Sequence, residues 1–396
     1  MALVAHIEGN CPSCGAKHKF GIVDVRGSFV LKGCEGCQYK ERQRLPPLKK
    51  KVVYLDQFFL SHAFRGNDDR FSAAAVRLEK IAQYQLLVAP YSTLHEDETD
   101  LWKRREELLG FIQKVSRGHE FVADYKLDET QIFKAFQAWT NGEESKYILE
   151  ENDVFEDEIH TWEGYFRINV DRYRKDRELS RSLKSQSVSS LIDMFDDWRE
   201  SQSTFEEDVL LELNDAAKGY LTTYFSYASR MSQGDFSAVL NAPVMSIVVQ
   251  NLLRSIPRNI SEEKRLQTIL AFFSSDHFRS VPGEELSARI FASLKKMVKT
   301  GAYKNKKKAK EKLSGFFYDV RHVAKYGPYC DAFFADKAMA ELLSAPEIDF
   351  SRRYGVQVFT VDTIDEFYVW LDQLEENMSD EHKAGLKQAY PFIEVQ

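Results

Sequence analysis

Lys51-Val-Val-Tyr-Leu-Asp56 is an apolar run that ends in an aspartate, and Cys330-Asp-Ala-Phe-Phe-Ala-Asp336 repeats this pattern near the other end of the chain. Such a strand would place a carboxylate at the edge of a buried sheet, where only a partner or a metal ion relieves its loss of hydration. Ligands of open α/β sheets bind beyond the carboxyl ends of the strands. We therefore predict that Asp56 and Asp336 meet at one edge of a parallel sheet.

The segments around these two runs alternate between strand and helix patterns, which is typical of a parallel sheet. The expected strands are 52–55, 86–89, 330–335 and 356–361, and the expected helices are about 71–85, one from 92 or 93, one from 316, 337–343 and a last one from 365. From about 120 to 312 the pattern changes to long stretches with apolar residues at helical spacing, for example 189–199, 205–229 and 261–273.

Four of the five cysteines form two Cys-x-x-Cys pairs, Cys11 with Cys14 and Cys34 with Cys37, separated by 19 residues. This spacing is typical of a zinc ribbon, in which four thiolates hold one structural Zn²⁺. The segments 19–23 and 28–31 between the pairs predict a short β-hairpin. The alternative is two disulfides, which a reducing cytoplasm disfavours. Cys330 has only strand-like apolar neighbours, so we expect a buried structural residue.

The length of 396 residues indicates two or three domains. We predict an α/β fold whose parallel-sheet core is interrupted by a large all-helical insertion, with a small N-terminal β zinc ribbon. The expected boundaries are 1–47 for the ribbon, 48–120 and 313–396 for the two parts of the core, and 121–312 for the insertion. Paired prolines and charges predict a linker at 42–51.

Two further acids complete a candidate site. Glu98 follows the second expected strand, and Asp319 opens a helix-like stretch. Crowded carboxylates repel one another unless a hard divalent cation neutralises them, which favours a Mg²⁺ or Mn²⁺ centre. Each acid also has an ordinary alternative role: Asp319 and Asp336 could cap the helices that follow them, and Glu98 could favour a helix dipole.

The residues resemble the successive motifs of PIN-domain nucleases. The matching stretches are Tyr54-Leu-Asp56-Gln, Ser92-x-x-His95-x-x-Glu98-Thr, Asp319-x-x-His322, and Cys330-Asp-Ala-Phe-Phe-Ala-Asp336-Lys followed by Tyr354-Gly-Val-Gln-Val-Phe-Thr. The resemblance implies that Asp56, Glu98, Asp319 and Asp336 bind a catalytic Mg²⁺ or Mn²⁺ in an endoribonuclease. It covers roughly 48–120 and 313–375. The helical insertion and the zinc ribbon depart from the family pattern, and a toxin or defence role would rest on family analogy alone.

Several other residues are candidates for supporting roles. His95 and His322 could contact phosphate or orient a ligand, although a lone helical histidine is more often structural. Asp331 is expected on the opposite face of the strand from Asp336, in a supporting or structural role. The segment 295–312 holds nine lysines against one glutamate, so Lys306, Lys307 and Lys308 could contact a phosphate backbone. The alternative for such a run is a solvated surface.

Composition limits the class of protein without fixing its function. A hydrophobic fraction of 43% and a charged fraction of 29% are ordinary for a globular protein, and no apolar run approaches the roughly 18 residues of a membrane span. We expect a cytoplasmic location and a nucleic-acid partner, with RNA favoured over DNA. The alternatives are a DNA or flap nuclease, a non-catalytic RNA-binding assembly module, and a zinc-dependent scaffold whose helical section recruits a protein partner or a second copy.

Overall fold

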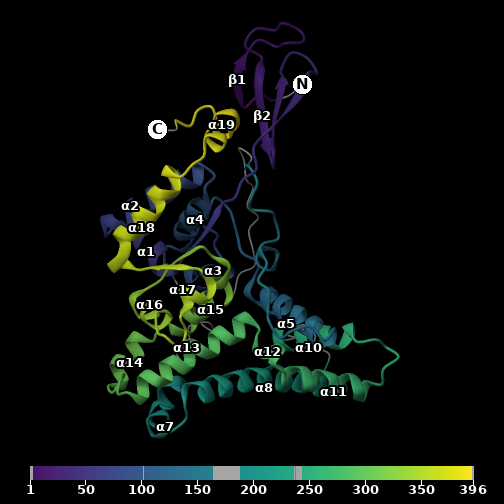
Figure 1. Ribbon diagram of the computed structural model, residues 1–396, viewed down its shortest axis with the longest axis vertical. Coiled ribbons are helices and arrows are strands. Elements are labelled where there is room, and N and C mark those ends of the chain that lie inside the picture. The colour runs from purple at the N-terminus through teal and green to yellow at the C-terminus, as the bar shows by residue number, and fades with distance from the viewer. Residues whose placement is uncertain (1–2, 101, 164–187, 236, 238–242, 395–396) are drawn as a thin grey trace.

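The computed structural model describes residues 3–100, 102–163, 188–235, 237 and 243–394. The fold is mixed α/β, with a parallel sheet of four strands, an antiparallel sheet of four strands and many helices. Along the long axis, the antiparallel sheet lies at one end, the parallel sheet and its helices lie in the middle, and a layer of long helices lies at the other end (Figure 1). Among the described helices, none is long and apolar enough to cross a membrane.

The predicted parallel sheet is confirmed. Its strands are β5 (Lys51–Leu55), β6 (Leu87–Val88), β7 (Ala332–Phe334) and β8 (Gln357–Phe359), in the order β6-β5-β7-β8 with every neighbouring pair parallel. Side chains of β5 alternate between two hydrophobic clusters: Val52 and Tyr54 lie in one, and Val53 and Leu55 lie in the other. Both faces are therefore covered, which explains why the strands read as continuous apolar runs.

Helices from distant parts of the chain cover the two faces. One face packs against α1 (Gln57–Arg65), α2 (Asp69–Gln83), α4 (Arg105–Ser116) and α18 (Ile364–Glu376). The other packs against α3 (Thr93–Thr99), α13 (Pro282–Lys299), α14 (Lys306–Lys312), α15 (Phe316–Tyr326), α16 (Lys337–Leu343) and α17 (Phe350–Tyr354). The helix expected to be the last is followed by one more, α19 (Asp380–Ala389).

The antiparallel sheet, called the N-terminal sheet below, consists of β1 (His6–Gly9), β2 (Phe20–Arg26), β3 (Phe29–Cys34) and β4 (Lys40–Arg44) in that order. The predicted hairpin is confirmed as β2 and β3. The predicted linker at 42–51 is wrong at both ends, since residues 42–44 belong to β4 and Lys51 begins β5. β4 is an edge strand made only of charged and polar residues, so a search for apolar strands did not find it.

The N-terminal sheet packs against the rest of the chain through Trp162. Its indole Nε1 donates to Pro46 O at 2.8 Å, and its backbone N donates to Gly27 O in the turn between β2 and β3. Gly385 of α19 lies so close that a Cβ atom there would come 2.7 Å from both Pro46 and Trp162. A side chain at position 385 would therefore separate the sheet from the body of the protein.

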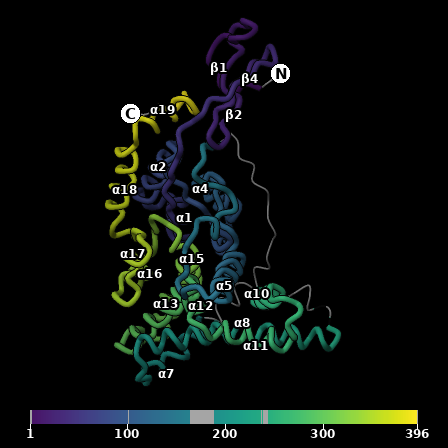
Figure 2. The backbone as a smooth tube through the Cα atoms, turned by 45° about the vertical axis from the view of Figure 1, so that its right-hand side comes forward, coloured from purple at the N-terminus to yellow at the C-terminus, as the bar shows by residue number. Residues whose placement is uncertain are grey.

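Between α4 and α15 the described regular elements are all helices, apart from isolated bridges at Glu120 and Trp162. This section contains α5 (Asp124–Thr140), α7 (Phe195–Glu200), α8 (Phe205–Ser232), α10 (Val244–Ser255), α11 (Glu262–Phe273), α12 (Asp276–Arg279), α13 and α14, and a short 3-10 helix η1 (Glu151–Asp153). The expected helix 189–199 is broken at Met194. Figure 2 shows α8, α10 and α11 at the end of the molecule away from the N-terminal sheet, while α13 packs on α15 and α16 beside the parallel sheet.

Candidate metal centre

Asp56 and Asp336 both lie at the carboxyl ends of neighbouring parallel strands. Asp56 N donates to Phe334 O at 3.1 Å, so the register places Asp56 beside the end of β7. Each aspartate also caps the helix that follows its strand: the Asp56 side chain accepts from Phe58 N at 3.4 Å, and Asp336 Oδ1 accepts from Met339 N at 2.7 Å. Asp336 therefore does cap the helix that follows it, as the alternative role predicted. It still lies at the carboxyl edge of the sheet.

Asp56, Glu98 and His322 converge at this edge from β5, α3 and α15. One ligand atom from each side chain lies within 4.8 Å of the others. Asp56 is 5% exposed and His322 is 1% exposed, and His322 Nε2 lies 3.2 Å from Glu98 Oε2. Two carboxylates and one imidazole at this spacing form a group that could hold a divalent cation.

The electrostatics of the cluster show how strongly the acids are crowded. Burial raises the pKa of Asp56, and the charges of Glu98 and Asp336 raise it further. Neighbouring His322 and the N–H of Phe58 act in the opposite direction, and the result is a pKa of about 6. Asp336 is thus close enough to act on Asp56, and a cation among these groups would relieve the repulsion.

A chain of buried hydrogen bonds behind the cluster fixes the protonation of His95. Ser92 N lies 3.0 Å from His95 Nδ1, and a backbone N–H can only donate, so Nδ1 accepts. The proton must then sit on His95 Nε2, which donates to Leu55 O at 2.8 Å. Burial and the nearby His322 hold the pKa of His95 well below its ordinary value, which is consistent with a neutral ring.

The same chain determines which nitrogen of His322 faces the acids. Ser92 Oγ lies 3.2 Å from His95 Nδ1 and is hydrogen-bonded to Tyr54 Oη at 2.9 Å. Tyr54 Oη also contacts His322 Nδ1, so the chain joins His95 to the nitrogen of His322 that points away from the acids. His322 Nε2 therefore faces Glu98 at 3.2 Å, in a position from which it could bind a metal ion.

The structure corrects the expected roles of the two histidines. His95 is completely buried and both ring nitrogens are bonded within the protein, so it cannot contact phosphate. His95 is the third residue of α3, the position at which a Glu or Gln side chain completes a capping box, and its ring stabilises the start of this helix. His322 is likewise buried and belongs to the cluster, so it is a candidate ligand and not a surface contact to substrate.

Asp319 and Asp336 lie outside the group of atoms within 4.8 Å, as judged over the described residues. Asp319 is one turn before His322 on α15, and its Oδ2 would lie 3.2 Å from a Cβ atom built on Gly315 at the start of that helix. Direct binding of the metal by Asp319 and Asp336 stays a prediction.

Asp331 lies at the opposite end of the strands from this cluster. Its Oδ2 accepts from Val52 N at 2.8 Å, and its Oδ1 accepts from Lys51 Nζ at 2.6 Å. These bonds join the amino ends of β5 and β7. Asp331 therefore holds the sheet together, which is the structural one of the two roles considered for it.

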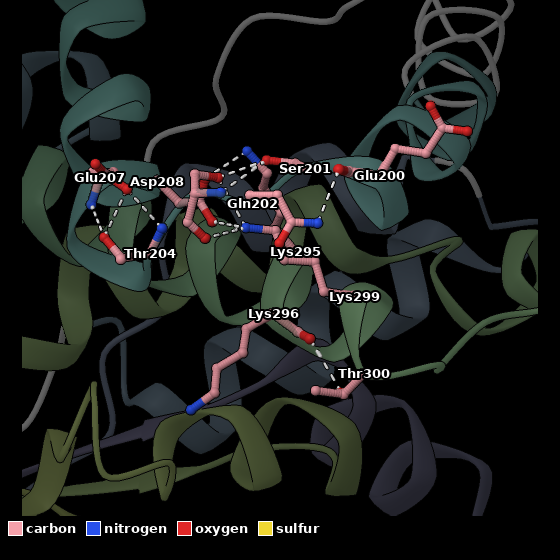
Figure 3. A network of polar contacts seen from close by, with 11 residues as sticks. Glu200, Ser201, Gln202, Thr204, Glu207, Asp208, Lys295, Lys296, Lys299 and Thr300 are labelled. Carbon is pink, nitrogen blue, oxygen red and sulfur yellow. Dashed lines mark hydrogen bonds and ion pairs between the residues drawn. The ribbon is translucent and has the colours of Figure 1, made fainter.

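Many of the nine lysines in 295–312 are engaged within the protein. Lys295 and Lys299 on α13 both point at the buried Asp208 of α8, with Nζ–Oδ distances of 2.5 and 2.7 Å (Figure 3). Lys296 pairs with Glu347, and Lys306 Nζ lies 2.7 Å from Asp196 Oδ2.

Lys307 and Lys308 are exposed on α14. The α13 pairs explain part of the run as a means of holding α8 against α13. A phosphate-binding role for Lys306, Lys307 and Lys308 stays a prediction.

The four N-terminal cysteines form a second cluster. Cys11 Sγ lies 3.7 Å from Cys37 Sγ, Cys14 Sγ lies 3.8 Å from Cys34 Sγ, and all four sulfurs lie within 4.8 Å of one another. None of them forms a disulfide. A tetrahedral zinc with Zn–S bonds of about 2.3 Å places its sulfur atoms about 3.8 Å apart, so this set could hold one zinc ion.

Comparison with known proteins gives no family. No protein-family model, curated protein or solved structure matches the chain. The function must therefore be argued from the two clusters and their surroundings.

Proposed function

We propose that the protein is a metal-dependent nuclease with a PIN-like core, and that it hydrolyses phosphodiester bonds of RNA in preference to DNA. The observation that carries the proposal is the convergence of Asp56, Glu98 and His322 at the carboxyl edge of a parallel sheet. This is the edge at which open α/β sheets bind their ligands. The order of the surrounding motifs adds the resemblance to PIN-domain nucleases.

Each residue of the cluster would have its own role in such a site. Asp56 and Glu98 would hold the cation through oxygen and His322 through Nε2, which the hydrogen bond to Tyr54 orients. A bound divalent cation would lower the pKa of a coordinated water and orient it toward phosphorus. Asp336, beside Asp56 but bonded through Oδ1 to the start of α16, would be available to accept a proton from that water through its other oxygen.

An assay of the full chain on labelled single-stranded RNA and DNA tests this proposal. We expect cleavage of RNA with Mn²⁺ added, slower cleavage with Mg²⁺, and none without a divalent cation. Mn²⁺ is favoured because an imidazole ligand suits transition metals better than Mg²⁺. No cleavage of any single strand with either metal would contradict the proposal.

Tyr54→Phe should weaken Mn²⁺ binding by about 10- to 100-fold, the usual effect of losing a group that orients a metal-binding histidine. The substitution removes one oxygen that contacts His322 Nδ1 and Ser92 Oγ. Tyr326→Phe is a matched control, since Tyr326 is also buried, stacks on Tyr54 and donates elsewhere, to Val122 O. Mn²⁺ titration followed by electron paramagnetic resonance measures the affinity. Equal affinity in both variants would remove Tyr54 from the metal site.

We further propose that Cys11, Cys14, Cys34 and Cys37 bind one structural Zn²⁺. Elemental analysis should find about one zinc per chain, and Cys14→Ser should lower that content. Cys330→Ser is the control, because Cys330 is buried beside β7 and its Sγ contacts Tyr326 O. A reduced, freshly purified protein without zinc would exclude this site.

A further inference from the structure

One face of the N-terminal sheet carries a row of basic side chains. Along β4 the exposed residues are Lys40, Arg42 and Arg44, while the two residues between them are half-buried. Alternate residues of a strand point to the same face and lie roughly 6.6–6.8 Å apart. The three cations therefore form a straight row, with a spacing close to that of consecutive phosphates in an extended single strand.

An aromatic ring lies on the same face. Phe29 of β3 pairs directly with Arg44, Leu31 pairs with Arg42, and Gly33 pairs with Lys40, so each of these positions shares a face with its basic partner. The Phe29 side chain is 39% exposed.

The opposite face of the N-terminal sheet packs into the hydrophobic core. Ile22, Val25 and Val30 are fully buried and belong to the hydrophobic cluster that includes Trp162. The face with Phe29 is therefore the one turned away from the body of the protein.

The charge of this face differs from that of the chain as a whole. Residues 17–51 hold ten lysines and arginines against three acids, in a protein with a net charge of −7. Within the described part of the chain, no acidic side chain forms an ion pair with Lys40, Arg42 or Arg44, whereas Arg26 pairs with Asp24 and Lys32 with Glu8. The row on β4 thus presents its charge outward, unlike the α13 lysines that pair with Asp208.

We propose that this face binds single-stranded nucleic acid, with the row on β4 along the phosphates and Phe29 stacked on a base. A positive track beside an exposed aromatic ring is the arrangement by which proteins hold single strands. Basic residues on an edge strand also prevent strand pairing, but that role does not explain an exposed phenylalanine beside them. The proposal deepens the nuclease function, on which it rests for the choice of substrate class.

The face lies at the amino end of the chain, while the Asp56 cluster lies at the carboxyl end of β5, the strand that leads away from the N-terminal sheet (Figure 1). Its role is therefore recruitment of the strand and not chemistry. Loss of the face should raise KM for RNA and leave kcat unchanged.

Fluorescence anisotropy with a short labelled oligouridine tests the proposal, using the full chain with Asp56→Asn so that the probe stays intact. Lys40→Gln, Arg42→Gln and Arg44→Gln together should weaken binding and flatten the dependence of log K on log salt by about 2, the loss of three phosphate contacts. Phe29→Ala should weaken binding about tenfold with the salt slope unchanged, because it removes only stacking. The zinc content of each variant reports that the sheet is still folded.

A matched control removes the same charge elsewhere. Lys146, Lys218 and Lys264 are exposed lysines of the helical section, and their joint replacement by Gln should change neither affinity nor slope.

The proposal is overturned if the β4 variant binds like the control, or if polyglutamate or an RNA duplex competes as well as oligouridine. Loss of binding in the β4 and Phe29 variants supports it even if the wild-type protein cleaves nothing. The two proposals can therefore fail separately.

Discussion

Asp56→Asn is expected to lower the rate of RNA cleavage by on the order of 10³-fold, the scale of losing one group that stabilises the transition state. Asn has the shape of Asp but no anionic oxygen, so it cannot neutralise a divalent cation. It is an equally good helix cap, and the Asp56 side chain caps α1 by accepting from Phe58 N. The substitution should therefore remove the chemistry and keep the fold.

The same substitution at a second helix cap provides the control. Asp68 caps α2 by accepting from Arg70 N at 3.0 Å, and its carboxylate pairs with Arg70 and does not join the group of Asp56, Glu98 and His322. Asp68→Asn should cleave RNA at the wild-type rate, and thermal unfolding should show both variants folded. Cleavage by Asp56→Asn at a rate within a few fold of wild type would exclude Asp56 as a metal ligand and, with it, the proposed centre.

The parallel sheet could be predicted because its strands are short apolar runs with a local signal. Asp56 and Asp336 end such runs, and the carboxyl ends of parallel strands must share an edge. The meeting of Asp56 with Glu98 followed from the same rule, since α3 begins after β6, which pairs with β5. The sheet and the positions of these acids depend on strand order and direction, which the pattern of apolar runs in the sequence predicts.

The position of His322 beside the two acids was harder to predict, because it depends on side-chain contacts and not on strand order. Its orientation is set by Tyr54 and Ser92, which read as an apolar strand residue and a helix cap. Ser92-x-x-His95 did carry a signal, the spacing of a capping box. It could have shown that His95 bonds to its own helix.

The charged edge strand β4 and the paired lysines of α13 were missed for a related reason. A basic residue reads the same in the sequence whether it faces solvent, a buried aspartate such as Asp208, or a phosphate. Only the tertiary contacts show that Lys295 pairs with Asp208 whereas Arg42 is exposed.

A buried ionic cluster around Glu163 joins the start of β5 to the segment that follows α4. Glu163 Oε1 accepts from Lys50 Nζ at 2.9 Å and from His119 Nε2 at 2.8 Å, and its Oε2 accepts from Arg117 Nε at 2.9 Å. Glu163 is 6% exposed and the Lys50 side chain is completely buried. Tyr390 Oη donates to the backbone O of Glu163, which ties the C-terminal segment to the same point.

Glu163→Gln should therefore lower the free energy of unfolding by about 3–5 kcal/mol, the range for removing one partner of a buried ion pair. Gln has nearly the same volume as Glu but lacks the negative charge that the buried Lys50 shares with the half-buried Arg117. Urea unfolding followed by circular dichroism measures the change. Glu375→Gln is the control, because Glu375 pairs with the partly exposed Lys80 and such pairs contribute less than about 1 kcal/mol.

The pH dependence of the Glu163→Gln effect separates lost charge from lost packing. Burial alone would raise the pKa of Glu163, but the hydrogen bond from His119 and the charges of Lys50 and Arg117 outweigh it and hold the pKa far below its ordinary value. A depressed folded-state pKa stabilises the protein above the unfolded pKa of about 4.3, and this stabilisation is lost as pH falls. The difference between wild type and Glu163→Gln should be full above about pH 5 and shrink below pH 4. A difference that stays constant with pH would show that Glu163 acts through shape and not through its charge.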